Sequence, residues 1–89
     1  MKPDIFYASL TPEKVRNITE ILFNLKYNRN IPISLGYRKK LRKYSVVFEQ
    51  IFRLRKHHRK VIAILRNNPE ILQITFKIGK KYFPEKCNV

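Results

Sequence analysis

The sequence predicts an all-α protein, a small bundle of three to four helices with an irregular N-terminal arm. Apolar residues recur at steps of three and four in separate stretches, and proline-containing start signals precede two of these stretches. Hydrophobic residues make up 44% of the 89 residues, although the formal net charge is +14. Disorder requires low hydrophobicity as well as high charge. We therefore expect a single folded domain over residues 1–89, with 1–10 as the arm and 84–89 as a tail.

The first helix is expected at about 12–27. Thr11 can cap it, Pro12 at the first helical position loses no useful donor, and Glu13 lies near the positive end of the helix dipole. Pro32 then favours an extended residue before it, which separates this helix from the next. The apolar face of the first helix consists of Val15, Ile18, Ile21, Leu22 and Leu25.

A second helix is expected at about 35–54, with Ser34 as its cap. Continuing its apolar stripe would bring Arg55 and His58 into the core, so we expect a turn or kink at 55–58 and a short third helix at 58–67. The stripe has the spacing of a helix face and consists of Tyr37, Leu41, Tyr44, Phe48 and Ile51.

The fourth helix is expected at about 69–83, because Asn68-Pro69-Glu70 repeats the start signal seen at Thr11. Apolar and polar residues alternate over 72–78, and this alternation is also the period of a strand. The start signal and the length of the run favour a helix, and a strand at 72–78 is the alternative.

Positive charge is concentrated in residues 36–66, which hold eleven Lys and Arg residues and one acid, Glu49. This segment therefore carries +10 of the net +14. Like charges four residues apart on a helix repel each other, and solvated helix faces normally mix signs. The pattern indicates a polyanionic partner. The candidate nucleic-acid-binding residues are Arg38, Lys39, Lys40, Arg42, Lys43, Arg53, Arg55, Lys56, Arg59 and Lys60.

Other candidate sites are weak. His57 and His58 point about 100° apart on a helix and do not form a metal site, and no cofactor is expected. The aromatic residues are expected in the core, with Tyr37 at the start of the basic helix as the exception to watch. Glu49 is expected to pair with Arg53, four residues later.

Nothing in the sequence favours catalysis, so we do not expect an enzyme. The six acids are scattered, no Gly-rich phosphate loop is present, and Cys87 follows Pro84 in the expected tail. A lone cysteine fits a reducing compartment. No apolar run approaches the ~20 residues of a membrane-spanning helix. We expect an intracellular protein, in the nucleus or a virion rather than the cytoplasm.

Residues 31–65 combine IPIS, then KKLRKY, then a basic run into VIAIL. This segment resembles small basic proteins of Polinton-like elements and related double-stranded DNA viruses of animals. The resemblance ends at Leu65, where Asn67-Asn68-Pro69-Glu70 replaces the glycine-rich apolar ending of those proteins. It implies a role in a viral or mobile-element particle, near packaged DNA, and transfers no functional residue.

Two functions are compatible with these patterns. The first is a non-enzymatic nucleic-acid-binding protein that contacts the phosphate backbone with little sequence specificity, with DNA favoured over RNA. The alternative is a structural or interaction protein whose basic face docks on an acidic protein partner. In that case the apolar stripe would pair with another chain, such as a second copy of this one.

Overall fold

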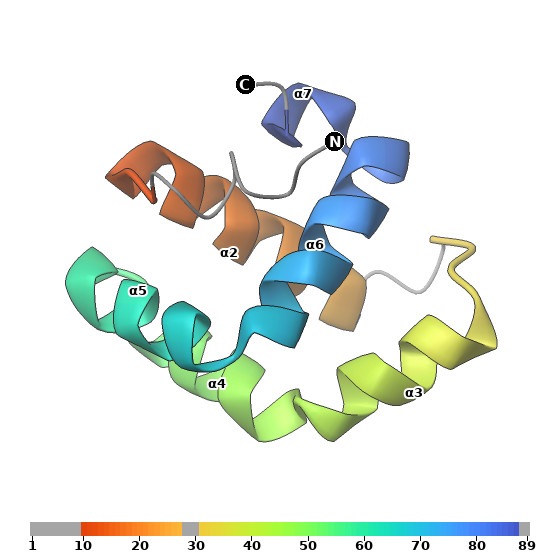
Figure 1. Ribbon diagram of the computed structural model, residues 1–89, viewed down its shortest axis with the longest axis horizontal. Helices are drawn as coiled ribbons and strands as arrows, with labels where there is room; N and C mark the ends of the chain where they lie inside the picture. Colours follow the sequence, from red (N-terminus) through yellow and green to blue (C-terminus); the bar gives the residue numbers. More distant parts are fainter. Residues whose placement is uncertain (1–9, 28–30, 88–89) are drawn as a thin grey trace.

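The computed structural model describes residues 10–27 and 31–87, and in these residues every regular element is a helix (Figure 1). The predicted all-α class is therefore confirmed, with more helices than expected. The strand alternative at 72–78 is wrong. The helices are α2 (Pro12–Tyr27), α3 (Leu35–Lys43), α4 (Ser45–Arg53), α5 (His58–Asn67), α6 (Pro69–Tyr82) and α7 (Pro84–Cys87).

Two predicted caps begin their helices as expected. The backbone amide of Lys14 donates to Oγ1 of Thr11 at 3.2 Å, and the amide of Tyr37 donates to Oγ of Ser34 at 3.3 Å. The third signal works differently, because the side-chain amide of Asn68 donates back to the carbonyl of Ile64 at 2.7 Å. Asn68 therefore ties α6 to the preceding helix α5 and does not cap α6.

The helix expected at 35–54 is divided into α3 and α4 at Tyr44. The amide of Tyr44 bonds to the carbonyl of Leu41 at 3.1 Å, three residues back, so the last turn of α3 is tightened and α4 starts in a new direction. Figure 1 shows the bend. Because the apolar stripe continues across it, Leu41, Phe48 and Ile51 are all buried in one core.

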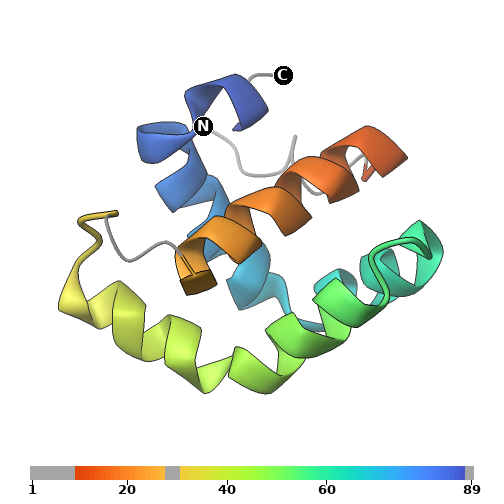
Figure 2. The ribbon, with the colours of Figure 1, turned by 180° about the vertical axis from the view of Figure 1, so that it is seen from behind.

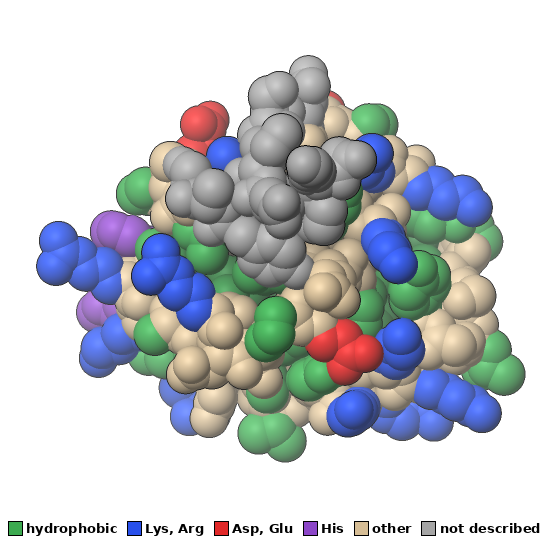
Figure 3. Space-filling model, in the orientation of Figure 1, with side chains coloured by type: hydrophobic (Ala, Val, Ile, Leu, Met, Phe, Trp, Pro, Cys, Tyr) green, Lys and Arg blue, Asp and Glu red, His purple; other side chains and the backbone are tan. Residues whose placement is uncertain are grey.

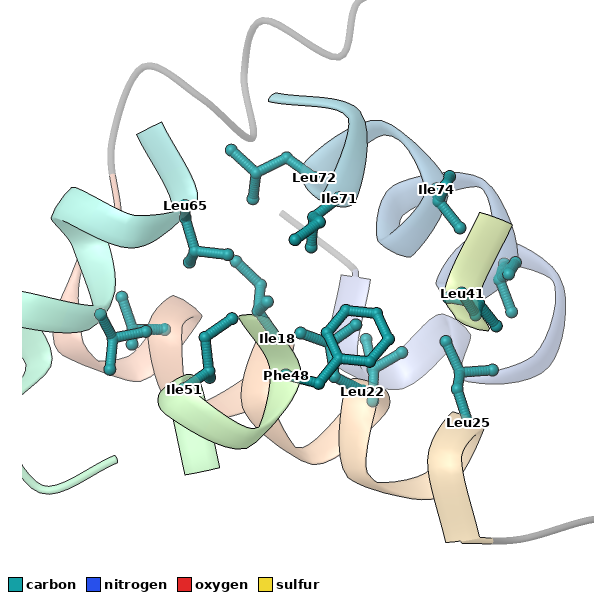
Figure 4. Packing of buried hydrophobic residues seen from close by; sticks show 14 of the residues in the cluster. Ile18, Leu22, Leu25, Leu41, Phe48, Ile51, Leu65, Ile71, Leu72 and Ile74 are labelled. Atoms are coloured by element: carbon teal, nitrogen blue, oxygen red, sulfur yellow. The ribbon is translucent and has the colours of Figure 1, made fainter. Parts of the chain in front are cut away.

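Helix α2 is the centre of the fold and packs against α4, α5, α6 and α7. Figure 4 shows Ile18 and Leu22 of α2 among side chains from the surrounding helices. The fully buried side chains are aliphatic, with Thr75 as the polar exception; its hydroxyl donates to the carbonyl of Ile71 at 2.7 Å. The largest of them are Ile18, Ile21, Leu22, Ile51, Val61, Leu65, Ile71, Leu72 and Thr75.

The segment expected as a tail instead folds onto the body through α7. Cys87 is only 6% exposed, and the side-chain amide of Asn17 on α2 donates to the carbonyl of Lys86 at 3.3 Å. Gly79 of α6 makes this close packing possible, because a Cβ there would lie 2.4 Å from the sulfur of Cys87. The expected arm at 1–10 lies outside the described residues except for Leu10, which is buried.

None of the helices in the described part of the chain is long and apolar enough to cross a membrane.

Candidate nucleic-acid interface

Helix α3 presents most of the first predicted basic cluster to solvent. Lys39, Lys40, Arg42 and Lys43 are exposed, whereas Leu41 between them is buried and anchors the helix. Arg38 differs from the others, because its guanidinium donates to the carbonyl of Ile31 at 3.0 Å and is partly buried. Four of the five predicted cations in this cluster are therefore available on one short, rigid helix.

A single carboxylate, Glu70 at the start of α6, lies among these cations. Its oxygens are 3.6 Å from Nζ of Lys40 and 3.9 Å from Nζ of Lys43, and it accepts a hydrogen bond from the hydroxyl of Tyr44. The hydrogen bond from Tyr44 is the main cause that lowers the pKa of Glu70, and the two lysine charges lower it further. The same hydrogen bond raises the pKa of Tyr44.

Helix α6 adds cations that the sequence analysis missed. Two hydrogen bonds tie α6 to the α3 region at opposite ends, from Tyr44 to Glu70 and from the hydroxyl of Tyr82 to the carbonyl of Pro32 at 3.0 Å. Lys77 and Lys81 follow Glu70 by seven and eleven residues, so they lie on the same side of α6 as Glu70. These spacings of seven and eleven residues could have predicted from the sequence that both lysines lie on the Glu70 side of the helix.

We call the exposed cations of α3, together with the two cations on the Glu70 side of α6, the basic face. Figure 3 shows Lys and Arg side chains gathered over α3 and along the neighbouring side of α6. Its members are Lys39, Lys40, Arg42, Lys43, Lys77 and Lys81.

The second predicted cluster surrounds the turn between α4 and α5, and its side chains are exposed. We call it the turn cluster. The turn at Leu54–Lys56 is where the sequence predicted it, and the guanidinium of Arg55 donates to the carbonyl of Phe52 at 3.3 Å. Helix α4 separates this cluster from α3, so the two clusters lie at opposite ends of α4 (Figure 1). The turn cluster consists of Arg53, Arg55, Lys56, Arg59 and Lys60.

Few cations are neutralised. Of the eighteen Lys and Arg residues described by the structure, only Lys26, Lys40, Lys43 and Lys86 lie within ion-pair distance of a carboxylate. Glu49 pairs with Lys26 of α2, so the predicted Glu49–Arg53 pair is wrong; Arg53 acts on Glu49 only through its charge. The hydrogen bond from Lys26 is the main cause that lowers the pKa of Glu49. Most of the positive charge therefore has no carboxylate partner within the described chain.

The aromatic residues do not all pack in the core. Phe23 and Tyr27 of α2 are each 53% exposed, so the expectation of core packing is wrong for both. They contact Phe52 of α4, and the ring centroids of Phe23 and Phe52 are 5.5 Å apart. Tyr37, the predicted exception, is only partly exposed and packs against the core.

Within residues 10–27 and 31–87, no group of three His, Cys, Asp or Glu side chains is placed to hold a metal ion. His57 is exposed and His58 is partly buried at the start of α5.

The chain matches no protein-family model, no curated protein and no solved structure. The resemblance of residues 31–65 to small basic proteins of Polinton-like elements therefore stays a prediction.

Proposed function

We propose that this protein is a non-enzymatic nucleic-acid-binding protein that contacts the phosphate backbone of DNA with little sequence specificity. The observation that carries the proposal is the basic face, where six exposed Lys and Arg side chains on two joined helices are accompanied by one carboxylate, Glu70, which lies within ion-pair distance of Lys40 and Lys43. Close like charges repel each other unless a polyanion neutralises them. Phosphates do so, and their counterions are released on binding.

The dimensions of α3 suit contacts with successive phosphates. Residues 39–43 span about 6 Å along the helix axis, and the phosphates of one strand are about 3.4 Å apart along the duplex axis. The cations of α3 therefore match about two to three phosphates, and Lys77 and Lys81 extend the contact along α6.

Low sequence specificity follows from the side chains that α3 offers. Bases are read mainly by Arg, Asn and Gln through paired hydrogen bonds, and α3 (Leu35–Lys43) contains no Asn or Gln. Its cations are mostly lysines, which bind phosphate as point charges. The preference for DNA over RNA comes from the resemblance of residues 31–65, so structured RNA belongs in the test.

The test is the salt dependence of binding to duplex DNA, measured by fluorescence anisotropy on nuclease-treated protein. The variant Lys39→Gln/Arg42→Gln removes two cations that have no carboxylate partner. We expect the slope of log affinity against log salt to fall by about 1.8, because each lost phosphate contact removes about 0.9.

The matched control is Lys14→Gln/Arg66→Gln, which removes the same two residue types from α2 and α5, neither of which contributes to the basic face. We expect this control to leave the slope nearly unchanged. Equal changes in both variants would show that only net charge matters and would reject the basic face as the site. Absence of binding to duplex DNA by the unaltered protein would reject the function.

The alternative is a structural protein that docks on an acidic partner. The apolar stripe expected to pair with another chain is not exposed. Leu41, Phe48 and Ile51 of that stripe are buried in the protein's own core and are not available to a second chain. The basic face remains accessible to an acidic protein as well as to DNA. Competition by polyglutamate at the same charge concentration as duplex DNA separates the two functions, because a phosphate-binding surface favours the duplex.

A further inference from the structure

Three aromatic rings meet where α2 packs against α4. Figure 2 shows these two helices from behind. The ring centroids of Phe23 and Tyr27 are 4.7 Å apart, and Phe52 lies beneath them with only 9% of its surface exposed. Phe52 belongs to the core, whereas Phe23 and Tyr27 leave more than half of their surface in water. Burying this apolar area against a partner is favourable.

Phe23 and Phe52 line an open groove of about 720 Å³ between α2 and the turn that follows α4, and Tyr27 adjoins Phe23 just beyond this lining. We call it the aromatic groove. Its volume lies in the range of about 300–1,000 Å³ that is typical of small-ligand pockets, so it has room for a nucleobase. The side chains used in the argument are Val15, Phe23, Phe52, Arg55 and Lys56, all of which line the groove.

The rim of the aromatic groove is positively charged. Arg55 and Lys56 belong to the turn cluster, are exposed, and have no carboxylate within ion-pair distance in the described chain. The hydrogen bond from Arg55 to the carbonyl of Phe52 holds this guanidinium next to the ring residue. The one acid lining the groove, Glu20, is already paired with Lys86 at 2.7 Å.

We propose that the aromatic groove binds single-stranded nucleic acid, with an unstacked base on Phe23 and Tyr27 and flanking phosphates on Arg55 and Lys56. Exposed aromatic rings beside unpaired cations are the combination that binds single strands, since every base has a face that can stack. The bases of a duplex are already paired and stacked, so their faces are not available. The inference rests on the proposed nucleic-acid-binding function and adds a second site to it.

An acidic peptide is the competing occupant, because it would meet the same cations. Helical peptides dock through a row of apolar anchors into a hydrophobic groove. Among the residues that line the groove, Phe23 is the one large apolar side chain that is exposed, because Val15 and Phe52 are buried, so the groove presents no row of apolar anchor sites. This lining favours stacking on the rings over insertion of an apolar row.

The test compares a single-stranded oligonucleotide of about ten nucleotides, within the site sizes of about 4–16 known for single-strand binders, with the same sequence as a duplex. The variant Phe23→Leu keeps an apolar side chain but removes the ring. We expect it to weaken single-strand binding about tenfold and to leave duplex binding unchanged. Phe23→Tyr, which keeps a ring, should bind the single strand nearly as well as the unaltered protein.

A second variant tests the groove without changing Phe23, so its result does not depend on how a substitution of Phe23 affects folding. Arg55→Gln/Lys56→Gln should weaken single-strand binding more than the matched control Lys14→Gln/Arg66→Gln. Because the chain contains no Trp, Phe23→Trp adds a direct readout, and we expect its fluorescence to be quenched when a base stacks on the ring.

The possible failures are distinguishable. If Phe23→Leu binds the single strand as tightly as the unaltered protein while the duplex still binds the basic face, the groove is not a base-stacking site and the proposed function stands. If neither single strand nor duplex binds, both proposals fail. If an acidic peptide quenches the Phe23→Trp fluorescence and oligonucleotides do not, the groove is a peptide site and this inference is overturned.

Discussion

The basic face and the aromatic groove are both positively charged, but they differ in what accompanies the charge. On the basic face, Leu41 among the cations of α3 is buried, so charge is the main feature that this part of the helix presents to a partner. At the aromatic groove, fewer cations lie beside the half-exposed ring of Phe23, which adjoins Tyr27. The first arrangement suits regularly spaced phosphates, and the second suits a flexible strand whose bases are free.

This difference shows why net charge alone does not describe the protein. A formal charge of +14 attracts any polyanion, and both regions contribute to that attraction. Under the two proposals, the ligand preference of each region comes from what lies beside its cations, which is the carboxylate of Glu70 in one region and the ring of Phe23 in the other. Equal numbers of cations removed from the two regions should therefore have unequal effects.

The largest expected effect comes from removing four cations from the basic face and comparing how much the binding of duplex and of single strand weakens. Lys39, Arg42, Lys77 and Lys81 changed together to Gln should weaken duplex binding by about 10³-fold near 0.1 M salt, because about four phosphate contacts are lost. Single-strand binding should fall much less. Anisotropy titrations with both ligands at several salt concentrations measure the two losses.

The reciprocal variant changes Arg55, Lys56, Arg59 and Lys60 of the turn cluster to Gln and removes the same charge. It should weaken single-strand binding more than duplex binding. If both quadruple variants weaken the two ligands by the same factors, the distinction between the regions is wrong.

The second prediction concerns a substitution that lowers the stability of the whole protein and does not alter either binding region. Gly79→Ala should destabilise the protein by about 1–3 kcal/mol through overpacking, since the new Cβ would meet the sulfur of Cys87 and, at 3.1 Å, Ile21. Urea unfolding followed by circular dichroism gives the free energy of unfolding. The folded fraction should keep its preference for each ligand, because Gly79 belongs to neither region.

Gly36→Ala is the matched control for that substitution. At Gly36 the nearest atom to an added Cβ is Oγ of Ser34, at 3.9 Å, so no clash arises. Alanine is the better helix former by up to about 1 kcal/mol, and the control should therefore stabilise α3. Destabilisation of similar size at both glycines would contradict the packing described for α7.

A smaller effect is expected from Glu70, which under the proposed function competes with phosphates for Lys40 and Lys43. Glu70→Gln removes a negative charge but keeps an acceptor for the hydroxyl of Tyr44. We expect duplex affinity to rise several-fold, because these two lysines lose a competing negative charge. Single-strand binding at the aromatic groove should not change. Glu85→Gln, in α7, is the charge-matched control and should have no comparable effect.

The smallest effect is a pH dependence of the same residue. The pKa of Glu70 is lowered from its ordinary value of 4.5 in the folded protein, so its contribution to stability is present above pH 4.5. That contribution is lost as the pH falls through the folded-state pKa. Unfolding midpoints of the unaltered protein and of Glu70→Gln should therefore converge as the pH falls below 4.5 and through the folded-state pKa of Glu70. A constant difference over this range would show that Glu70 gains nothing from Tyr44 and the lysines.

The sequence predicted the helices well where local signals are complete. Thr11 and Pro12 fix the start of α2, and its apolar face predicted Val15 to Leu25 as core, as observed. The turn at Leu54–Lys56 was also predictable, because continuing the stripe would have buried Arg55. Helix class, this start and this turn all depend on residues that are close together in the chain.

Features that depend on distant residues were missed. The break at Tyr44 involves a hydrogen bond to Glu70, twenty-six residues away, and the burial of Cys87 depends on the absence of a side chain at Gly79. Lys26 pairs with Glu49 across two helices. The exposure of Phe23 depends on how α2 crosses α4. A helical period predicts which face is apolar, but not how much of that face a neighbour covers.

The close packing of Cys87 against Gly79 makes the thiol of Cys87 a natural probe of local unfolding at α7. Burial raises the pKa of the Cys87 thiol, so a thiol-specific alkylating reagent reacts slowly while α7 is docked and quickly when α7 separates from α6. The ratio of the alkylation rates of the native and the denatured chain then measures how often this end of the protein opens. No label needs to be introduced, because this is the only cysteine in the sequence.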